Sequence, residues 1–92
     1  MNKTELTEHV ATRTDLTRSD AARAVDAVWA VIAETLGRGG EVSIPGFGRF
    51  HVGERSARAG VNPRTGERIA IAASRVPRFT AGSTLRGAVR SR

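Results

Sequence analysis

The most constraining feature of this sequence is a stretch of 22 residues, Gly53 to Ser74, that has almost no large apolar side chains. Only Val61, Ile69 and Ile71 interrupt its small and polar residues. Residues 62–66, Asn-Pro-Arg-Thr-Gly, lie at its middle, where proline suits the second position of a turn and glycine a positive φ. The stretch therefore predicts a long hairpin that cannot bury a face of its own, and such a ribbon is only marginally stable alone.

Charge is distributed unevenly along the chain. Residues 1–48 hold five basic and seven acidic residues, whereas residues 49–92 hold ten arginines against two glutamates, so the net charge of +6 comes from the second half. Five of these arginines recur through the hairpin region: Arg55, Arg58, Arg64, Arg68 and Arg75. A surface that only keeps the protein soluble does not need charges separated by sign. The separation indicates a nucleic-acid partner, and guanidinium groups on both strands suit a phosphate-lined minor groove, where base readout is coarse.

The first half of the chain predicts two helices. Asn2 followed by Glu5 resembles a capping box and predicts a helix from about residue 3 to residue 13. Thr17 followed by Asp20 repeats the signal for a second helix, which the glycines at 37, 39 and 40 end. This second helix has a continuous apolar stripe at helical spacing. The stripe consists of Ala21, Val25, Val28, Trp29, Ile32 and Leu36.

Strands follow the second helix. Residues 41–44 alternate, with Val42 and Ile44 on one side, and residues 45–48 form a tight turn before Phe50 and Val52 continue the alternation. After the hairpin, Val76, Pro77 and Phe79 return to core character, and a last short helix contains Leu85, Ala88 and Val89. The order predicts an α+β fold in a single domain, residues 1–92, with the hairpin arm at about 53–74.

The size of the chain predicts an oligomer. Without the hairpin about 70 residues remain, which is near the lower limit for a self-sufficient core. The stripe of the second helix even includes a tryptophan, so two such stripes packed together would supply the missing core. The expected dimer core consists of Val28, Trp29, Ile32, Phe47, Phe50 and Phe79. The phenylalanines could instead stack on single-stranded nucleic acid, but Phe50 alternates with polar neighbours and is better explained as a core residue.

Several functional classes are disfavoured. The chain has no cysteine, which excludes disulfides and thiolate metal sites. It shows no signal-peptide pattern and no apolar stretch of membrane-spanning length, so we expect a cytoplasmic protein. His9 and His51 have no clustered partners, and no nucleophile-elbow or phosphate-loop pattern is present. We therefore expect no catalytic residue, no metal, no cofactor, no small-molecule substrate and no membrane.

Motifs along the whole chain follow one known pattern. The most specific is Asn-Pro-Arg-Thr-Gly at 62–66, inside a basic hairpin and correctly spaced after Gly-Phe-Gly-Arg-Phe at 46–50. The others lie at residues 1–6, 26–28, 55–58, 73–79 and 82–85. On these motifs the chain resembles the bacterial HU/IHF family of histone-like DNA-binding proteins, and the Arg-Val-Pro-Arg-Phe segment at 75–79 is more similar to HU.

The resemblance implies an intertwined α+β dimer with a helical base, a three-stranded antiparallel sheet per chain and a long β-ribbon arm. The two arms would contact the minor groove of double-stranded DNA at the nucleoid, and Pro63 at each tip would wedge between base pairs. The alternative to a wedging role is that Pro63 is only an ordinary turn residue. The implied DNA-binding residues are Arg55, Arg58, Asn62, Pro63, Arg64, Thr65, Gly66 and Arg75, with Lys3, Gly46, Arg68 and Arg86 as secondary candidates.

The chain departs from the family pattern by losing basic residues. Val61 precedes Asn-Pro where a basic residue is common, Gly53 stands at another such position, and Thr80 and Ser83 replace frequent lysines. Ala81 stands where a proline is usual. These changes concern the extent of the phosphate footprint rather than the fold.

The leading hypothesis is a homodimer that bends and compacts duplex DNA with little sequence preference. Three alternatives remain open at this point. The chain could be a subunit of a sequence-preferring heterodimer of the integration-host-factor type. It could be a small nuclease, although the arm offers only Glu54 and Glu67 as carboxylates. It could also be an interaction module whose basic hairpin binds an acidic protein.

Overall fold

A computed structural model describes residues 1–91 and shows the expected α+β class, with helices first and an antiparallel sheet after them. Contacts within the chain define two compact units, Met1–Thr35 and a second that begins at Leu36. The first unit is helical, and the second contains the sheet, the ribbon and the last helix.

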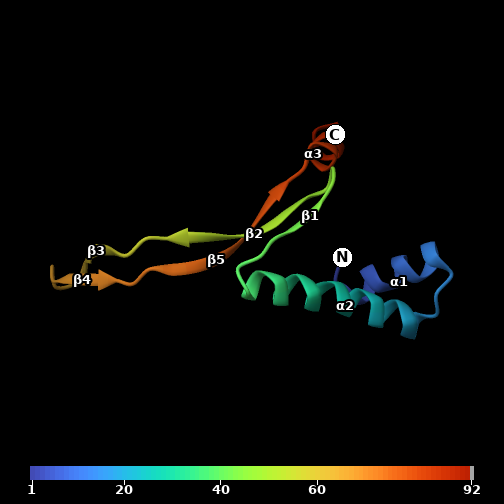
Figure 1. Ribbon diagram of the computed structural model, residues 1–92, viewed down its shortest axis with the longest axis horizontal. Coiled ribbons are helices and arrows are strands. Elements are labelled where there is room, and N and C mark those ends of the chain that lie inside the picture. Colours follow the sequence, from blue (N-terminus) through green and yellow to red (C-terminus); the bar gives the residue numbers. More distant parts are fainter. Residues whose placement is uncertain (92) are drawn as a thin grey trace. The chain divides into compact units, whose positions relative to one another are not determined.

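In the first unit, helix α1 (Lys3–Thr14) lies alongside α2 (Arg18–Gly37) (Figure 1). Both predicted helix starts are confirmed. The Glu5 N–H donates to Oδ1 of Asn2 over 2.9 Å, and the Asp20 N–H donates to Oγ1 of Thr17 over 3.0 Å. Each bond satisfies an amide that the first turn of a helix leaves unpaired, which is why the two helices begin where they do.

The packing of α1 against α2 buries few side chains. Ala21 and Val25 of α2 are the buried apolar residues of the part of the chain that the structure describes, and Thr7 of α1 is its buried polar residue. Farther along the apolar stripe, Val28 is 51% exposed and Trp29 is 45% exposed. The stripe therefore exists as predicted, but its Val28 and Trp29 remain exposed in the single chain.

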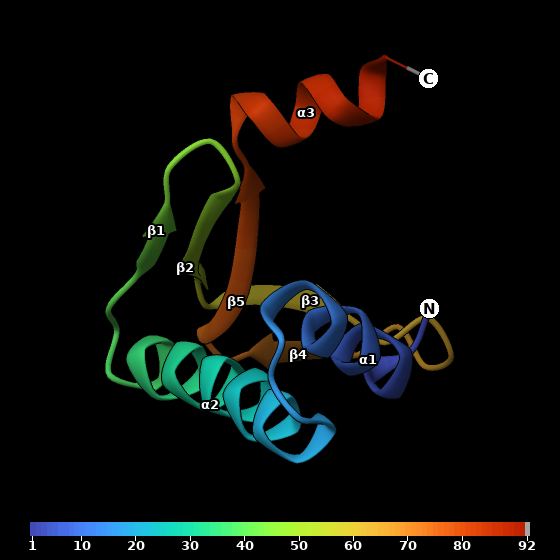
Figure 2. The same ribbon diagram turned by 90° about the vertical axis from the view of Figure 1, so that its right-hand side faces the viewer.

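The second unit contains a three-stranded antiparallel sheet in the order β1-β2-β5, with strands at Val42–Ile44, Gly48–Arg55 and Ser74–Ala81. The predicted turn before β2 is present: the Phe47 N–H donates to the Ile44 carbonyl over 3.0 Å, and Gly46 has a φ of 78°. Helix α3 (Ser83–Arg90) follows β5 at this end of the sheet (Figure 2). Its Leu85 N–H donates to the Gly46 carbonyl over 3.1 Å, which fixes the start of α3 against the turn.

Strands β2 and β5 continue side by side into a second pair, β3 (Arg58–Val61) and β4 (Arg68–Ile71) (Figure 1). The sheet ends at the Arg55–Ser74 pair, and the outer ribbon begins at the Arg58–Ile71 pair. Two residues on each strand, 56–57 and 72–73, form a break between them. The extended ribbon agrees with the predicted arm.

The register divides the sheet into two faces, because directly paired residues in antiparallel strands lie on the same side. One face is mainly apolar, apart from the Glu54–Arg75 pair at its ribbon end, and includes a cluster of aromatic rings: Phe79 lies 4.8 Å from Phe50 and 5.8 Å from Phe47 between ring centroids. Even so, Phe47 is 46% exposed and Phe79 is 44% exposed. The apolar face of the sheet is thus as incompletely covered as the stripe of α2.

The opposite face of the sheet is polar and basic. It consists of Ser43, Arg49, His51, Gly53, Arg55, Ser74, Val76, Arg78 and Thr80. Nε2 of His51 lies 2.9 Å from Oγ1 of Thr80, and the Arg49 guanidinium pairs with Glu41 over 2.9 Å. This face leads directly into the ribbon.

Candidate nucleic-acid interface

The tip of the ribbon is a well-defined turn at residues 62–66. The Gly66 N–H donates to the Asn62 carbonyl and the Asn62 N–H donates to the Glu67 carbonyl, each over 2.8 Å. The Asn62 side chain also accepts a bond from the Arg64 N–H over 2.9 Å, and Gly66 has a φ of 75°. The positive φ of Gly66 matches the role predicted for glycine in this turn, and the Asn62 bond is a type of contact that asparagine commonly makes in turns. Pro63 takes no part in these bonds and is exposed at the end of the ribbon.

Thr65 also has a local role at the tip. Its Oγ1 accepts a bond from the Glu67 N–H over 3.2 Å. Of the candidate DNA-binding residues at the tip, Asn62 and Thr65 therefore build the turn, while the ring of Pro63 and the side chain of Arg64 are left exposed to solvent.

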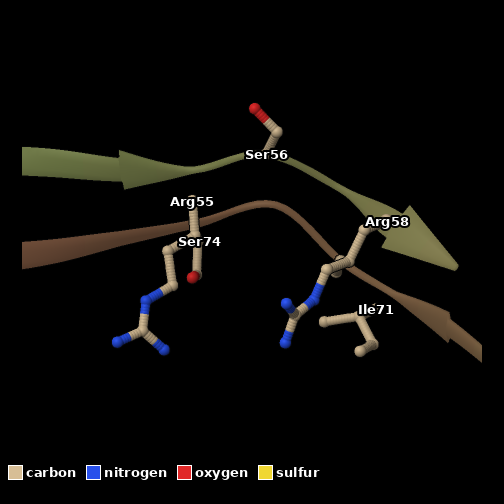
Figure 3. Close-up of a pocket in the computed structure, with 6 residues that line it drawn as sticks. Arg55, Ser56, Arg58, Ile71 and Ser74 are labelled. Atoms are coloured by element: carbon tan, nitrogen blue, oxygen red, sulfur yellow. The ribbon is translucent and has the colours of Figure 1, made fainter. Parts of the chain in front are cut away.

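Arg55 and Arg58 lie on the same side of the ribbon. Regular alternation would place residues three apart on opposite sides, but the break at residues 56–57 redirects the chain. Figure 3 shows both guanidinium groups pointing the same way, beside Ser74 and Ile71, while Ser56 points to the other side. The break therefore brings together two of the predicted phosphate-binding residues, across the join between sheet and outer ribbon.

These two arginines line a shallow hollow of about 390 Å³, together with Ser56, Ile71, Ala72 and Ser74. Within residues 1–91, no carboxylate lies within 4.0 Å of either guanidinium group. Both side chains are exposed. Their charges are therefore available to an anion in solvent and are not already neutralised by the protein.

The other predicted arm arginines are not brought into this group. Arg75 is paired in register with Glu54 and so lies on the face opposite Arg55. Its Nη2 lies 3.1 Å from the position that a Cβ on Gly39 would occupy, so the side chain is directed toward the loop before β1. Arg68 is paired with Val61, on the opposite side of the outer ribbon from Arg58. The ribbon thus has arginine on both sides rather than in one cluster.

The remaining secondary DNA-binding candidates are Lys3, Gly46 and Arg86, and none of them belongs to the ribbon. The Lys3 ammonium lies 3.0 Å from Oδ1 of Asp26 within the first unit. Gly46 forms the turn before β2, and its carbonyl accepts the bond from Leu85 already described. Arg86 is exposed on α3.

Arg78 was not singled out by the sequence analysis. It belongs to the polar face of the sheet, and its side chain runs across Gly53 on the neighbouring strand. A glycine inside a strand often marks a close approach by another group. Gly53 was therefore the sequence feature that could have pointed to Arg78.

Residues 1–91 contain no group of three or more His, Cys, Asp or Glu side chains that could hold a metal ion. No helix among the same residues has the length and apolar character needed to cross a membrane.

A pair of helices, a small antiparallel sheet and an exposed basic β-ribbon together define a nucleic-acid-binding protein of the β-ribbon class. The family model described as bacterial DNA-binding protein matches residues 1–90. The chain therefore belongs to this family, the HU/IHF histone-like DNA-binding proteins, as the sequence motifs predicted.

Individual relatives agree with this assignment. DNA-binding protein HU-1 of Halalkalibacterium halodurans is 52% identical over 90 residues, which cover 98% of this chain and all of the relative. DNA-binding protein HU of Streptococcus thermophilus is 55% identical over 89 residues, 97% of this chain and 98% of the relative. A cocrystal structure of Anabaena HU with DNA has a TM-score of 0.87 and 42% identity, covering 97% of both chains. The chain is thus an HU-type DNA-binding protein, and this membership confirms the expectation that it is not an enzyme.

Proposed function

We propose that this protein is a homodimer that binds duplex DNA with little sequence preference and bends it, with both ribbons in the minor groove. The observation that carries the proposal is the ribbon itself. It presents two arginines on one side, Arg55 and Arg58, that have no carboxylate partner among residues 1–91, and it ends in an exposed proline. Groups of this kind suit phosphate contacts along a groove and an apolar wedge at the deepest point.

The two open apolar surfaces support the dimer. A stripe on α2 and an aromatic cluster on the sheet each leave large side chains about half exposed, which is unfavourable in water at roughly 25 cal/mol per Å² of apolar surface. A second copy of the chain offers the same two surfaces, and a two-fold dimer would bury both at once. The expected dimer core of Val28, Trp29, Ile32, Phe47, Phe50 and Phe79 is part of this proposal.

Pro63 supports the bending. A proline ring is rigid and apolar and has no N–H to leave unpaired, and such a side chain can enter a base step and kink the duplex. The turn at residues 62–66 holds the ring at the end of the ribbon. In the cell, such a protein would act at the nucleoid in the cytoplasm and compact DNA. The similarity to Anabaena HU, whose structure is a cocrystal with DNA, is consistent with this proposal.

The salt dependence of binding tests the proposal. If each arm neutralises about three to five phosphates, a dimer neutralises roughly six to ten, and the slope of log K against log salt should be about −5 to −9. Fluorescence anisotropy with the purified single chain and a labelled duplex, at several salt concentrations, measures this slope. Affinity should vary little among random sequences, with a mild preference for flexible or A·T-rich steps.

Three results would contradict this proposal. A slope near zero would show that binding does not depend on phosphate contacts. A sharp consensus after selection from random duplexes would favour a sequence-specific protein. Failure of the purified chain to bind without a second, different subunit would favour a heterodimer of the integration-host-factor type.

A further inference from the structure

Arg78 and Gly53 occupy adjacent positions on the polar face of the sheet. Arg78 is paired in register with His51, and Gly53 is paired with Val76, so the two residues are diagonal neighbours on one face. A Cβ on residue 53 would collide with Nε of Arg78 and would lie 2.6 Å from its Cδ and 3.2 Å from its Cζ. The arginine side chain therefore fills the space that any side chain at residue 53 would need.

The direction of this side chain matters because Gly53 lies between Arg78 and the arm. Arg55 follows on the same face of β2, two residues beyond Gly53 and about 6.8 Å farther along the strand. Arg58 lies on the same side as Arg55 beyond the break in the ribbon (Figure 3). The guanidinium groups of Arg78, Arg55 and Arg58 thus follow one another along one side, from the sheet into the arm.

Arg78 also has no partner that would neutralise it. Among residues 1–91, no carboxylate lies within 4.0 Å of its guanidinium group, whereas the neighbouring Arg49 is paired with Glu41. The other groups beside it on this face, His51 and Thr80, are joined to each other. Among the described residues, Arg78 is therefore a cation at the root of the ribbon that no carboxylate neutralises.

We propose that Arg78 is a further DNA-binding residue, which contacts the phosphate backbone at the root of the arm, and that Gly53 is the residue that makes room for it. This inference rests on the proposed function. It extends the phosphate footprint from the arm onto the sheet. It also explains how a chain with glycine at residue 53 keeps a basic group at that point of the ribbon: the charge comes from the opposite strand.

The test is the affinity and salt dependence of duplex binding by four variants of the full chain. A homodimer carries two copies of Arg78, so Arg78→Ala should weaken binding about 25-fold at roughly 0.1 M salt and reduce the salt slope by about two units, one for each lost phosphate contact. Arg78→Lys should retain most of the affinity because it keeps the charge. Gly53→Ala should weaken binding by displacing the Arg78 side chain, and Gly53→Arg combined with Arg78→Ala should restore the slope by supplying the charge from β2.

Arg13→Ala is the matched control, since it removes one positive charge from α1, far along the sequence from the ribbon, and should leave the slope unchanged. Thermal melting of each variant monitors the fold. Binding by the wild type together with an unchanged slope for Arg78→Ala would overturn this inference alone. An equal loss in Arg13→Ala would also overturn it, because net charge would then explain the effect. Absence of duplex binding by the wild type would instead overturn the proposed function.

Discussion

Replacing Val28 or Ile32 by aspartate is expected to abolish folding of the chain. Both residues belong to the apolar stripe of α2, and Val28 is 51% exposed in the single chain although it is a large apolar residue on a continuous stripe. In the proposed dimer these positions are buried, and an unpaired carboxylate there would cost about 3–5 kcal/mol. That is a large part of the total stability of a small domain.

Circular dichroism and analytical ultracentrifugation at micromolar concentration measure this effect. The matched control is Ala30→Asp, which introduces the same side chain into the same helix on the side away from the stripe, where residue 30 is exposed. It should remain folded and dimeric. A wild-type protein that is folded and monomeric under these conditions, or a Val28→Asp protein as stable as the control, would show that the stripe is not a dimer interface.

Replacing Pro63 by alanine is expected to remove much of the DNA bending and most of the preference for distorted DNA. Unstacking one base step costs a few kcal/mol, which the additional contacts to bent DNA offset. Nicked or gapped DNA is already partly unstacked, so the wild type should prefer it to intact duplex, and the variant should not. The substitution should preserve the tip, because the hydrogen bonds of the turn come from Asn62, Thr65 and Gly66.

Fluorescence transfer across a labelled duplex of ~30 base pairs measures the bend, and thermal melting of the free protein monitors the fold. Arg58→Ala is the contrasting variant: it should weaken binding to every DNA alike and reduce the salt slope by about one unit for each lost phosphate contact, which is about two units for the dimer, with the wedge intact. If a stably folded Pro63→Ala protein bends DNA as strongly as the wild type, Pro63 is only a turn residue.

The local elements of this fold could be predicted because each has its own chemical signal. Asn2 and Thr17 satisfy free amides at helix starts, and the glycines after residue 36 end α2. The turn at residues 62–66 follows from the conformations that proline, asparagine and glycine prefer. The long ribbon followed from composition, since a stretch with so few large apolar residues cannot form part of a core.

The orientation of side chains along the ribbon could not be predicted. Strict alternation places Arg55 and Arg58 on opposite sides, and only the break at residues 56–57 brings them together (Figure 3). No local pattern marks that break, because both strands are interrupted by the same number of residues and the register is preserved. Arg75 shows the same limit: the family resemblance suggests a DNA-binding residue, but only the pairing with Glu54 shows that it lies on the face opposite Arg55.

Arg78 shows a second limit of sequence reasoning. Its contact with Gly53 joins residues 25 positions apart and depends on the register between β2 and β5. In the sequence alone, Gly53 indicates only that a basic residue common at this position is missing. Only the paired strands show that a side chain from β5 fills its place.

The most direct test of the central claim is the stoichiometry of the complex with DNA. Sedimentation of the purified chain with a fluorescent duplex of ~20 base pairs, at limiting protein and moderate salt, gives the mass of the complex. Two chains bound to one duplex, with no stable complex of one chain, is the result expected for a dimer that places two arms on the DNA. A complex of a single chain with one duplex, or no complex at any salt concentration, would contradict the account.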